Sequence, residues 1–444
     1  MTKQLHPQFR SSPTEAPRQI LCSLVIFITI LYLAAQPGVA TRNESIHKAA
    51  LAVFISFLGF SFLQTRDLIL TWPHPGLWRM VFGACSFYTF LLVTLLMLTK
   101  EEARSCLHFL FPGIGTQEEF DSGLRLRIDA VMGTCQLSTA ALYRQLFHCP
   151  WFLAHAVGWS VKMLIFRDYF LAFFAAILFE IMEVTLMHVV PEFEECWWDS
   201  LFLDTLGANL LGMFLGSTLN KWIVARRKQA EREKSYAEKE QVEVSKIELG
   251  EEFNWVGRDW KLFSSPKRML QVSIAAVFTS LSELNSFLLI NAFGIANNNS
   301  GCVLFRLTFV GLIAIPAGAE WYAYIEECDH RGKHAIIRLG PSLWLLFWTT
   351  LLEITVAVKF FPSHMWVEIE KTGNITGILY NVLLPLLTSF TLILLWVMLR
   401  YNVLAVLLGK ERKEKQSSIQ ILDGLIALSL IPIAHIFQMG WKWD

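Results

Sequence analysis

Apolar runs of about 20 residues alternate with shorter polar segments along almost the whole chain. A helix of about 20 apolar residues crosses a hydrocarbon core of about 30 Å. The pattern therefore predicts an all-α, polytopic integral membrane protein with about ten transmembrane helices. The predicted spans are 19–36, 48–64, 79–98, 151–167, 169–190, 200–225, 268–290, 303–325, 341–361 and 377–400.

The polar segments between these spans divide the chain into five parts. A further apolar stretch at 419–438 contains Asp423 and Pro432, and it stays open as an eleventh span, a re-entrant segment or an interfacial helix. The parts are a cytosolic segment (1–18), six spans that include the catalytic core and an acidic lumenal loop at 191–199 (19–225), a cytosolic polar linker (226–267), four spans (268–410) and a C-terminal segment with room for one more membrane helix (411–444).

Two independent signals orient the chain with its N-terminus in the cytosol. In this orientation the cytosolic segments carry most of the Lys and Arg residues, as the positive-inside rule requires. Three Asn-x-Ser/Thr sequons, at Asn43, Asn298 and Asn374, are glycosylation candidates and fall in loops on the opposite side. Both signals predict that the loop at 191–199 is lumenal.

The composition agrees with a membrane protein and excludes several other classes. The chain has 54% apolar and 17% charged residues, whereas soluble proteins average about 25% charged residues. Lys+Arg and Asp+Glu are equal at 38 each, so no net positive field favours a nucleic-acid partner. The eight cysteines are scattered without a CxxC pair, which indicates neither a disulfide-stapled scaffold nor a zinc site.

The candidate chemistry lies in a cluster of acidic residues. A carboxylate inside a membrane span is costly and is a functional candidate by default. Oxygen ligands suit a divalent cation, and calcium is the metal expected on the lumenal side. The predicted metal ligands are Glu180, Glu183, Glu195, Asp199 and Asp204.

Each of these residues also has a structural interpretation. Glu180 and Glu183 lie three apart on one helix face and could form a buried hydrogen-bonded pair. Glu192 and Glu194 are interpreted as solvated loop charges rather than ligands. Trp197 and Trp198 fit an interfacial aromatic belt, and equally a cation–π site for a quaternary ammonium.

His155 is the histidine that a helical hairpin brings toward the acidic cluster. A lone histidine on an apolar helix usually packs in the core, but the acidic neighbours make it a candidate general base or nucleophile. His155, Glu183 and Asp204 are thus the predicted catalytic residues. His188 is more simply an interface residue, although it could orient a carboxylate.

Several motifs resemble the base-exchange phosphatidylserine synthases of eukaryotes, over residues from about 70 to 325. The most specific block runs from Glu195 through Cys196-Trp197-Trp198-Asp199-Ser200 to Asp204, and it follows Phe179-Glu180-Ile181-Met182-Glu183. The others are Ala154-His155-(x2)-Gly158-Trp159-(x2)-Lys162-(x4)-Arg167, Met187-His188, Pro191, Pro73-His74-Pro75-(x2)-Trp78-Arg79, Glu283-Leu284-Asn285-Ser286-Phe287, Arg306, Pro316 and Tyr322-Ala323-Tyr324.

The resemblance implies calcium-dependent exchange of lipid headgroups in the endoplasmic reticulum membrane, with the active site near the lumenal side. L-serine would replace the choline of phosphatidylcholine or the ethanolamine of phosphatidylethanolamine, and Ca²⁺ would be the cofactor. The implied partners are these substrates and the membrane lipids, with no nucleic acid, and a homodimer stays open. The substrate-binding candidates that it implies are Trp159, Lys162, Arg167, His188, Trp197, Trp198, Glu283, Asn285 and Arg306.

Two departures from the family pattern bear on control and specificity. Trp72 stands where the family commonly has an arginine associated with product inhibition, and Glu192 replaces a usual asparagine. Two rival functions also stay in view. A metal-dependent lipid transferase of the CDP-alcohol type would need an Asp-Gly-x2-Ala-Arg signature, which is absent. A cation or proton transporter would use the intramembrane carboxylates as a pathway.

Overall fold

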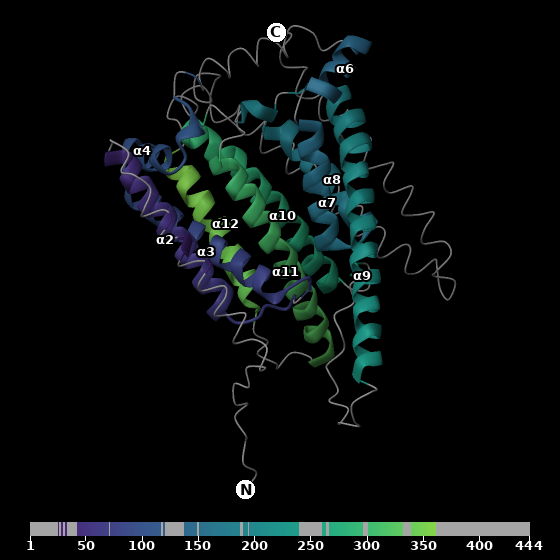
Figure 1. The fold of residues 1–444 in the computed structure, drawn as a ribbon. Coiled ribbons are helices and arrows are strands. Elements are labelled where there is room, and N and C mark those ends of the chain that lie inside the picture. The colour runs from purple at the N-terminus through teal and green to yellow at the C-terminus, as the bar shows by residue number, and fades with distance from the viewer. Residues whose placement is uncertain are drawn as a thin grey trace. The chain divides into compact units, whose positions relative to one another are not determined.

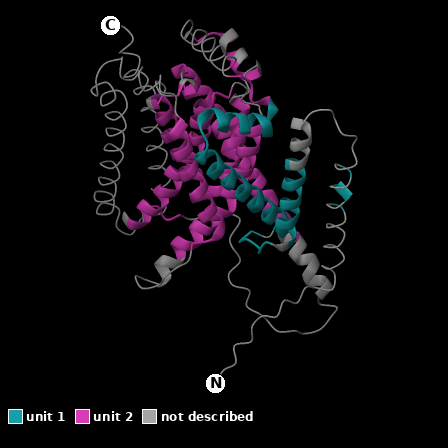
Figure 2. Cartoon of the chain, turned by 90° about the vertical axis from the view of Figure 1, so that its left-hand side faces the viewer, with its two compact units in different colours: residues 1–112 teal, residues 113–444 magenta. Residues whose placement is uncertain are grey.

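The computed structural model describes residues 42–116 apart from 71, 137–148, 151–186, 190–238 apart from 194, 260–262, 266–295, 301–331 and 339–360, with a few isolated positions. All regular elements in these ranges are helices, which confirms the predicted all-α class. The chain divides into two compact units, residues 1–112 and 113–444 (Figure 2).

Unit 1 contains three helices, α2 (Arg42–Gln64), α3 (Pro75–Met97) and α4 (Lys100–Leu110). α2 packs along α3, and a side chain at Gly76 or Gly83 of α3 would overlap Phe62 or Ser61 of α2. The sequon at Asn43 lies in the first turn of α2 rather than in the predicted loop. The short connection before α3 is held by Arg79, whose Nε donates to Asp67 at 2.7 Å.

Unit 2 contains the candidate chemistry. In chain order its elements are η1 (Pro112–Ile114, at its border), α6 (Thr139–His148), α7 (Trp151–Phe166), α8 (Tyr169–Leu186), η2 (Pro191–Phe193), the π-helix η3 (Asp199–Asn209), α9 (Leu210–Glu238), α10 (Pro266–Phe293), α11 (Gly301–Arg331) and α12 (Pro341–Phe360). α7 packs against α9 and α11, and α12 packs against both α10 and α11 (Figure 1).

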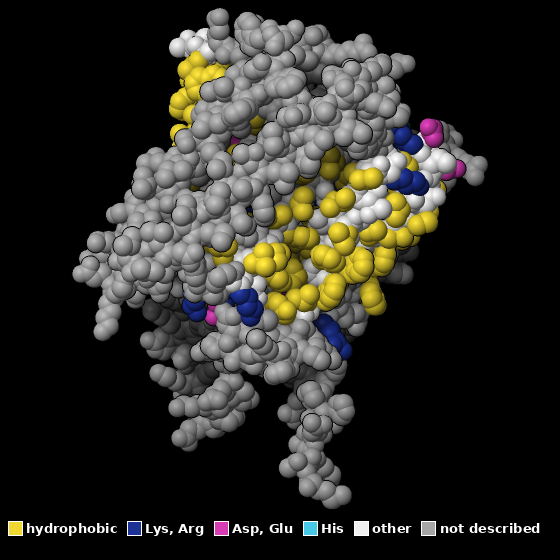
Figure 3. All heavy atoms as spheres, turned by 180° about the vertical axis from the view of Figure 1, so that it is seen from behind, with side chains coloured by type: hydrophobic (Ala, Val, Ile, Leu, Met, Phe, Trp, Pro, Cys, Tyr) yellow, Lys and Arg dark blue, Asp and Glu magenta, His cyan; other side chains and the backbone are white. Residues whose placement is uncertain are grey.

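The helices confirm the prediction of a multi-pass membrane protein. The predicted count of ten spans is not confirmed. Every predicted span between residues 48 and 361 coincides with a helix, whereas 19–36, 377–400 and 419–438 lie outside the well-described ranges. Figure 3 shows a broad apolar surface with Lys and Arg at its edges. Among the described residues five segments are long and apolar enough to cross a membrane: Pro75–Met97, Asp199–Arg226, Lys267–Phe293, Gly301–Glu326 and Pro341–Phe360.

Two glycines let α7 and α9 pack backbone against backbone. A Cβ at Gly212 would overlap the carbonyl oxygen of Ala156, and a Cβ at Gly216 would overlap that of Ser160. The Ser160 hydroxyl also donates to the Gly212 carbonyl oxygen at 3.0 Å. Small residues four apart are the usual means of close helix packing in membranes. This contact fixes α7 relative to η3, which runs directly into α9.

A buried carboxylate defines the start of α12. Glu320 of α11 accepts hydrogen bonds from the backbone N–H groups of Ser342, at 3.3 Å, and Leu343, at 2.8 Å. These donors have no partner within their own helix, so the side chain supplies one. Gly340 precedes the helix because any Cβ there would overlap the Glu320 carboxylate. The contact ties α11 to α12.

Replacing Gly212 by valine is expected to prevent the close packing of α7 on α9. The new side chain meets backbone atoms that cannot move aside, so the loss of stability should be about 3 kcal/mol or more. The thermal midpoint of the purified protein in detergent checks this. Gly311→Ala is the matched control, since a Cβ there makes only an ordinary contact of 3.9 Å with Val161. An unchanged midpoint for Gly212→Val would contradict the packing argument.

Candidate active site

The predicted acidic residues come from three adjoining elements. Glu180 and Glu183 lie on α8 with exposed fractions of 0% and 7%, and Asp199 and Asp204 lie on η3 with 6% and 5%. Glu195 lies in the short segment before η3. Glu180 and Glu183 each interact electrostatically with Glu195 and Asp204. The structure therefore gathers these carboxylates, as the helical-hairpin argument predicts.

The π-helix is what aligns the acidic positions of η3. Its backbone hydrogen bonds join residues five apart, so residues at that spacing fall near one face, whereas an α-helix would turn them away from each other. Asp199, Asp204 and Asn209 have this spacing. Asn209 is fully buried and donates from Nδ2 to Glu180 Oε1 at 3.2 Å. Sequence reasoning missed Asn209, although the repeated five-residue spacing was a readable signal.

The carboxylates are only partly compensated by hydrogen bonds. The carboxyl groups of Glu195 and Asp204 lie within reach of each other. Gln145 of α6 donates to Asp199. Among the residues that the structure describes, Glu180 Oε2 and Glu183 Oε2 are buried with no hydrogen-bond partner. Buried oxygens without partners are costly, so this arrangement is suited to accepting a ligand.

The chemistry of the five candidate ligands suits a hard divalent cation. All five candidate ligands offer oxygen, and two of the buried oxygens have no partner. However, in the part of the chain that the structure describes, no group of three or more His, Cys, Asp or Glu side chains is arranged so that it could hold a metal ion. The side chains therefore have to draw together if they are to bind one.

His155 faces the acidic segment from the second turn of α7. It is half-buried and interacts electrostatically with both Glu195 and Asp199. Burial of the Glu195 carboxyl, with Asp204 and Asp199 nearby, raises the pKa of Glu195 well above its ordinary value, and His155 opposes that shift. His155 thus lies beside a buried carboxyl group whose pKa is raised.

Lys162 and Glu283 form an ion pair between α7 and α10, next to the acidic cluster. Lys162 Nζ also lies 3.7 Å from the ring centroid of Trp159 and 4.7 Å from that of Phe179. Lys162 interacts electrostatically with Glu180, and Glu283 with Glu183. Three predicted substrate-binding residues, Trp159, Lys162 and Glu283, are therefore brought to the site.

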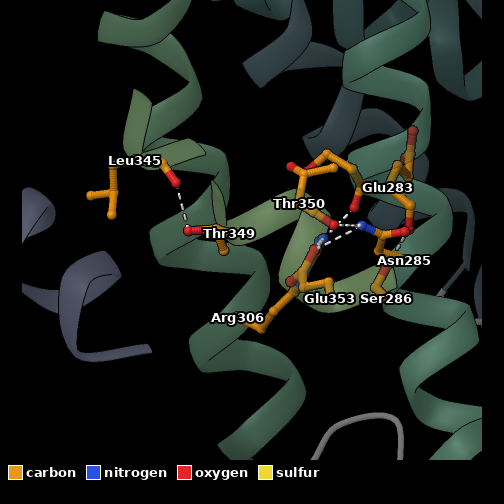
Figure 4. Close-up of polar contacts among 9 residues, drawn as sticks. Glu283, Asn285, Ser286, Arg306, Leu345, Thr349, Thr350 and Glu353 are labelled. Carbon is orange, nitrogen blue, oxygen red and sulfur yellow. Dashed lines mark hydrogen bonds and ion pairs between the residues drawn. The ribbon is translucent and has the colours of Figure 1, made fainter. Parts of the chain in front are cut away.

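A second polar network joins α10, α11 and α12 beside Glu283 (Figure 4). Arg306 donates from Nε to Glu353 Oε1 and from Nη2 to Glu353 Oε2, both at 2.9 Å. Asn285 Nδ2 donates to Glu353 Oε2 and to the Thr350 carbonyl oxygen, both at 3.1 Å. Glu353 was missed by sequence reasoning, although a carboxylate in the middle of a predicted span was the same signal that singled out Glu180.

Other predicted substrate-binding residues lie apart from the acidic cluster or in the core. Arg167 is buried at the far end of α7, twelve residues or about 18 Å along the helix from His155. Trp198 is 3% exposed and packs with Leu203, so its ring belongs to the core rather than to an aromatic belt. Trp197 packs on Phe202. His188 lies outside the described residues.

The interpretation of Glu192 as a solvated charge is wrong. Glu192 is 6% exposed, and its Oε2 accepts a hydrogen bond from Asn291 Nδ2 of α10 at 2.7 Å. The adjacent Phe193 packs on Phe287 of α10 with ring centroids 4.8 Å apart. This loop segment is anchored on α10, and an apolar neighbour was the clue that the side chain is covered. Glu194 lies outside the described residues.

Cys196 forms a disulfide, which scattered cysteines without a CxxC pair did not indicate. Its partner lies outside the described residues, where side chains of several cysteines fall. Cys196 belongs to a cluster with Trp198 and Leu203, against which Leu142 and Leu146 of α6 pack. The bond therefore restrains the loop that delivers Glu195 and Asp199 to the site.

The fold and site define a multi-pass membrane enzyme with a buried acidic centre, and comparison with known proteins specifies the class. Residues 73–361 match the model of the phosphatidyl serine synthase family. Because the match covers more than half of the chain, the protein belongs to this family. It is a transferase of phospholipid biosynthesis that makes phosphatidylserine with serine as a substrate, as the sequence resemblance predicts.

The relatives carry two kinds of name. The chain is similar to Arabidopsis thaliana CDP-diacylglycerol–serine O-phosphatidyltransferase 1, with 30% identity over 75% of this chain and 79% of the relative. It is also similar to Mus musculus phosphatidylserine synthase 2, with 27% identity over 90% and 81%. Danio rerio phosphatidylserine synthase 1 shares 26% identity over 87% and 79%. The plant name gives the donor CDP-diacylglycerol and the acceptor serine, whereas the animal names give only the product, phosphatidylserine.

Alkylation of the denatured protein is expected to show that Cys196 is oxidised. Without a reductant, the Cys196→Ser protein should take up one more alkyl group than the wild type, because the variant frees the partner cysteine. Mass spectrometry of the intact chains checks the difference. The prediction is contradicted if a peptide with alkylated Cys196 is abundant in the unreduced wild type. The peptide with Cys85, a buried cysteine outside any disulfide, is the control and should be alkylated in both proteins.

Proposed function

We propose that the protein makes phosphatidylserine by base exchange in the endoplasmic reticulum membrane. The serine hydroxyl oxygen attacks the phosphorus of phosphatidylcholine or phosphatidylethanolamine, a new O–P bond forms, and the bond to choline or ethanolamine breaks. The observation that carries this proposal is the group of buried carboxylates, two with unpartnered oxygens, beside His155. Exchange needs no nucleotide, since one phosphodiester replaces another.

His155 is the proposed general base in this reaction. A serine hydroxyl is a poor nucleophile at neutral pH until a base accepts its proton. The proton then passes from His155 to the alkoxide of the departing choline or ethanolamine, so the reaction leaves the histidine as it began. An attack by His155 itself on phosphorus is the alternative role, with the phosphatidyl group carried on the ring nitrogen until serine replaces it. The proximity of His155 to Glu195 and Asp199 supports either role, because neighbouring carboxyl groups can orient the ring.

Glu180, Glu183, Glu195, Asp199 and Asp204 are the proposed ligands of Ca²⁺. Calcium would supply positive charge for the phosphodiester oxygens as charge gathers there in the transition state. The carboxylates of Glu183 and Asp204 also lie where they can orient the reacting groups. Support for the metal comes from the chemistry of the donors and from the two buried oxygens without hydrogen bonds.

The proposed lumenal placement of the site has three supports. The distribution of Lys and Arg favours this orientation, and the predicted sequons fall on the same side. The disulfide at Cys196 adds an independent argument, since disulfides persist in oxidising compartments such as the lumen of the endoplasmic reticulum. Cys196 directly follows Glu195, so the compartment of the disulfide is the compartment of the acidic segment.

CDP-diacylglycerol is the second candidate donor. The names of the plant relatives favour it, at 30% identity. The absent Asp-Gly-x2-Ala-Arg signature and the similarity to animal phosphatidylserine synthases over 87–90% of the chain favour exchange instead. The two donors release different products, CMP or a free amino alcohol, and can be separated in one assay.

Purified protein is expected to incorporate radiolabelled L-serine into lipid from phosphatidylcholine or phosphatidylethanolamine, with release of the amino alcohol. Chelation of calcium should abolish the reaction, and added calcium should restore it. Glu183→Gln and Asp204→Asn keep the size of each side chain and should lose activity at low calcium. Full activity of both variants at low calcium would show that Glu183 and Asp204 are not metal ligands. Incorporation only from CDP-diacylglycerol would overturn base exchange.

The His155→Asn protein is expected to fold and bind calcium but to lose about 10²- to 10⁴-fold in turnover, since asparagine can donate a hydrogen bond but cannot accept the serine proton. Turnover at saturating serine and calcium measures the loss. Thermal stability with and without calcium, measured on the same samples, separates lost chemistry from misfolding. Near-normal turnover in the folded variant would assign the proton to a carboxylate.

A further inference from the structure

The Lys162–Glu283 ion pair has the location and the two opposite charges of a binding site for a small zwitterion. It joins α7 to α10 in the site, and the side chains are 9% and 27% exposed. A pair hidden in this way gains little stability over apolar residues of the same volume, because both charges lose their hydration. A role in packing alone therefore explains the pair poorly.

The turn of α7 beside this pair, on the side of His155, carries no side chain at Gly158. Gly158 lies between His155 and Lys162 on the same stretch of α7, and a Cβ there would come to 3.9 Å from Glu283 Oε1. Glu283 thus faces a helix turn that carries no side chain. Helix side chains lean toward the N-terminus of their helix, so Lys162 leans toward the same turn. His155 is three residues from Gly158, which is about 4.5 Å along the helix axis.

The acceptor of the reaction matches this arrangement. At neutral pH L-serine carries an α-ammonium and an α-carboxylate on one carbon, and its hydroxyl on the next. We infer that Glu283 binds the α-ammonium and Lys162 binds the α-carboxylate, with the amino acid beside Gly158 and its hydroxyl directed toward His155. This inference rests on serine being the acceptor, as in the proposed function, and not on the identity of the donor lipid.

When serine binds, two ion pairs replace one, so the site stays electrically balanced. In the free protein Lys162 and Glu283 neutralise each other. When serine enters, each side chain takes the opposite charge of the ligand, so no charge is left buried and unpaired. Trp159 and Phe179 lie over the ammonium of Lys162 and exclude water from it, which strengthens a charge-assisted hydrogen bond to the incoming carboxylate.

The network of Figure 4 holds the Glu283 side of this subsite in place. The Ser286 hydroxyl donates to the Glu283 carbonyl oxygen, and Asn285 binds Glu353 of α12. Glu353 is fully buried and is itself fixed by both nitrogens of Arg306. Glu283 is therefore presented from a turn of α10 that is anchored on two other helices.

Competition experiments on the wild type test the subsite without any substitution. The donor is phosphatidylcholine, so that ethanolamine is not also the leaving group. Ethanolamine lacks the carboxylate and 3-hydroxypropanoate lacks the ammonium, while both keep the hydroxyl. Each should inhibit radiolabelled serine incorporation with an inhibition constant at least about tenfold above the serine KM, because each forfeits one charge-assisted hydrogen bond. Either analogue inhibiting as well as serine itself would overturn the assignment of the corresponding charge.

Variants then assign each charge to its residue. Lys162→Met should raise the serine KM by about tenfold or more, change kcat little, and leave the ethanolamine inhibition constant nearly unchanged. Glu283→Gln should raise both constants, since serine and ethanolamine share the ammonium. Lys162→Arg keeps the charge and should recover part of the serine affinity. Lys261→Met, which removes another ion-paired lysine at 3.4 Å from Glu326, is the matched control and should behave as wild type.

The outcomes separate the subsite from the proposed function. Equal rises of the serine KM and the ethanolamine constant in Lys162→Met, or a loss of kcat at unchanged KM, would make the pair structural and overturn the inference. If the wild type uses serine only with CDP-diacylglycerol, base exchange fails, and the same constants measured with that donor still decide the subsite. If Lys162→Met does not fold, the wild-type competition and the Lys162→Arg protein carry the decision.

Discussion

The cost of keeping carboxylates inside an apolar helical bundle governs this structure. A charge removed from water needs a proton, a hydrogen-bond donor or an opposite charge beside it. The last two occur here. Asn209 donates to Glu180, and Arg306 is paired with Glu353. Each solution requires side chains from different helices, so the polar contacts determine which helices can be neighbours.

The degree of compensation distinguishes structural from functional carboxylates. Glu353 accepts two hydrogen bonds from Arg306 and one from Asn285, and it has the charge balance expected of a permanent contact. Glu180 and Glu183 are equally buried, yet each keeps an oxygen without a partner. Burial alone would rank all three residues together. The unsatisfied oxygens are what mark the α8 pair as a place where a ligand completes the bonding.

The sequence predicted the parts of the molecule that depend on composition and local period. The spans from 48 to 361 and the acidic residues follow from apolar runs and the cost of charge within them. What depends on contacts between distant segments escaped prediction. The Asn291 partner that buries Glu192 and the disulfide of Cys196 arise from tertiary packing. The π-helix aligns Asn209 with Asp204 at a five-residue spacing that was readable in the sequence. Glu353 was readable in principle, because it sits in a predicted span.

The charge balance of the site limits how an anionic lipid can react there. Glu195 and Asp199 lie near His155, and Lys162, which interacts with Glu180, already pairs with Glu283. A phosphodiester brings another negative charge, which such a site repels unless protons or a cation offset it. The divalent cation of the proposed function would offset this charge without protonating the carboxylates, so the base proposed at His155 and the anionic substrate lead to the same requirement.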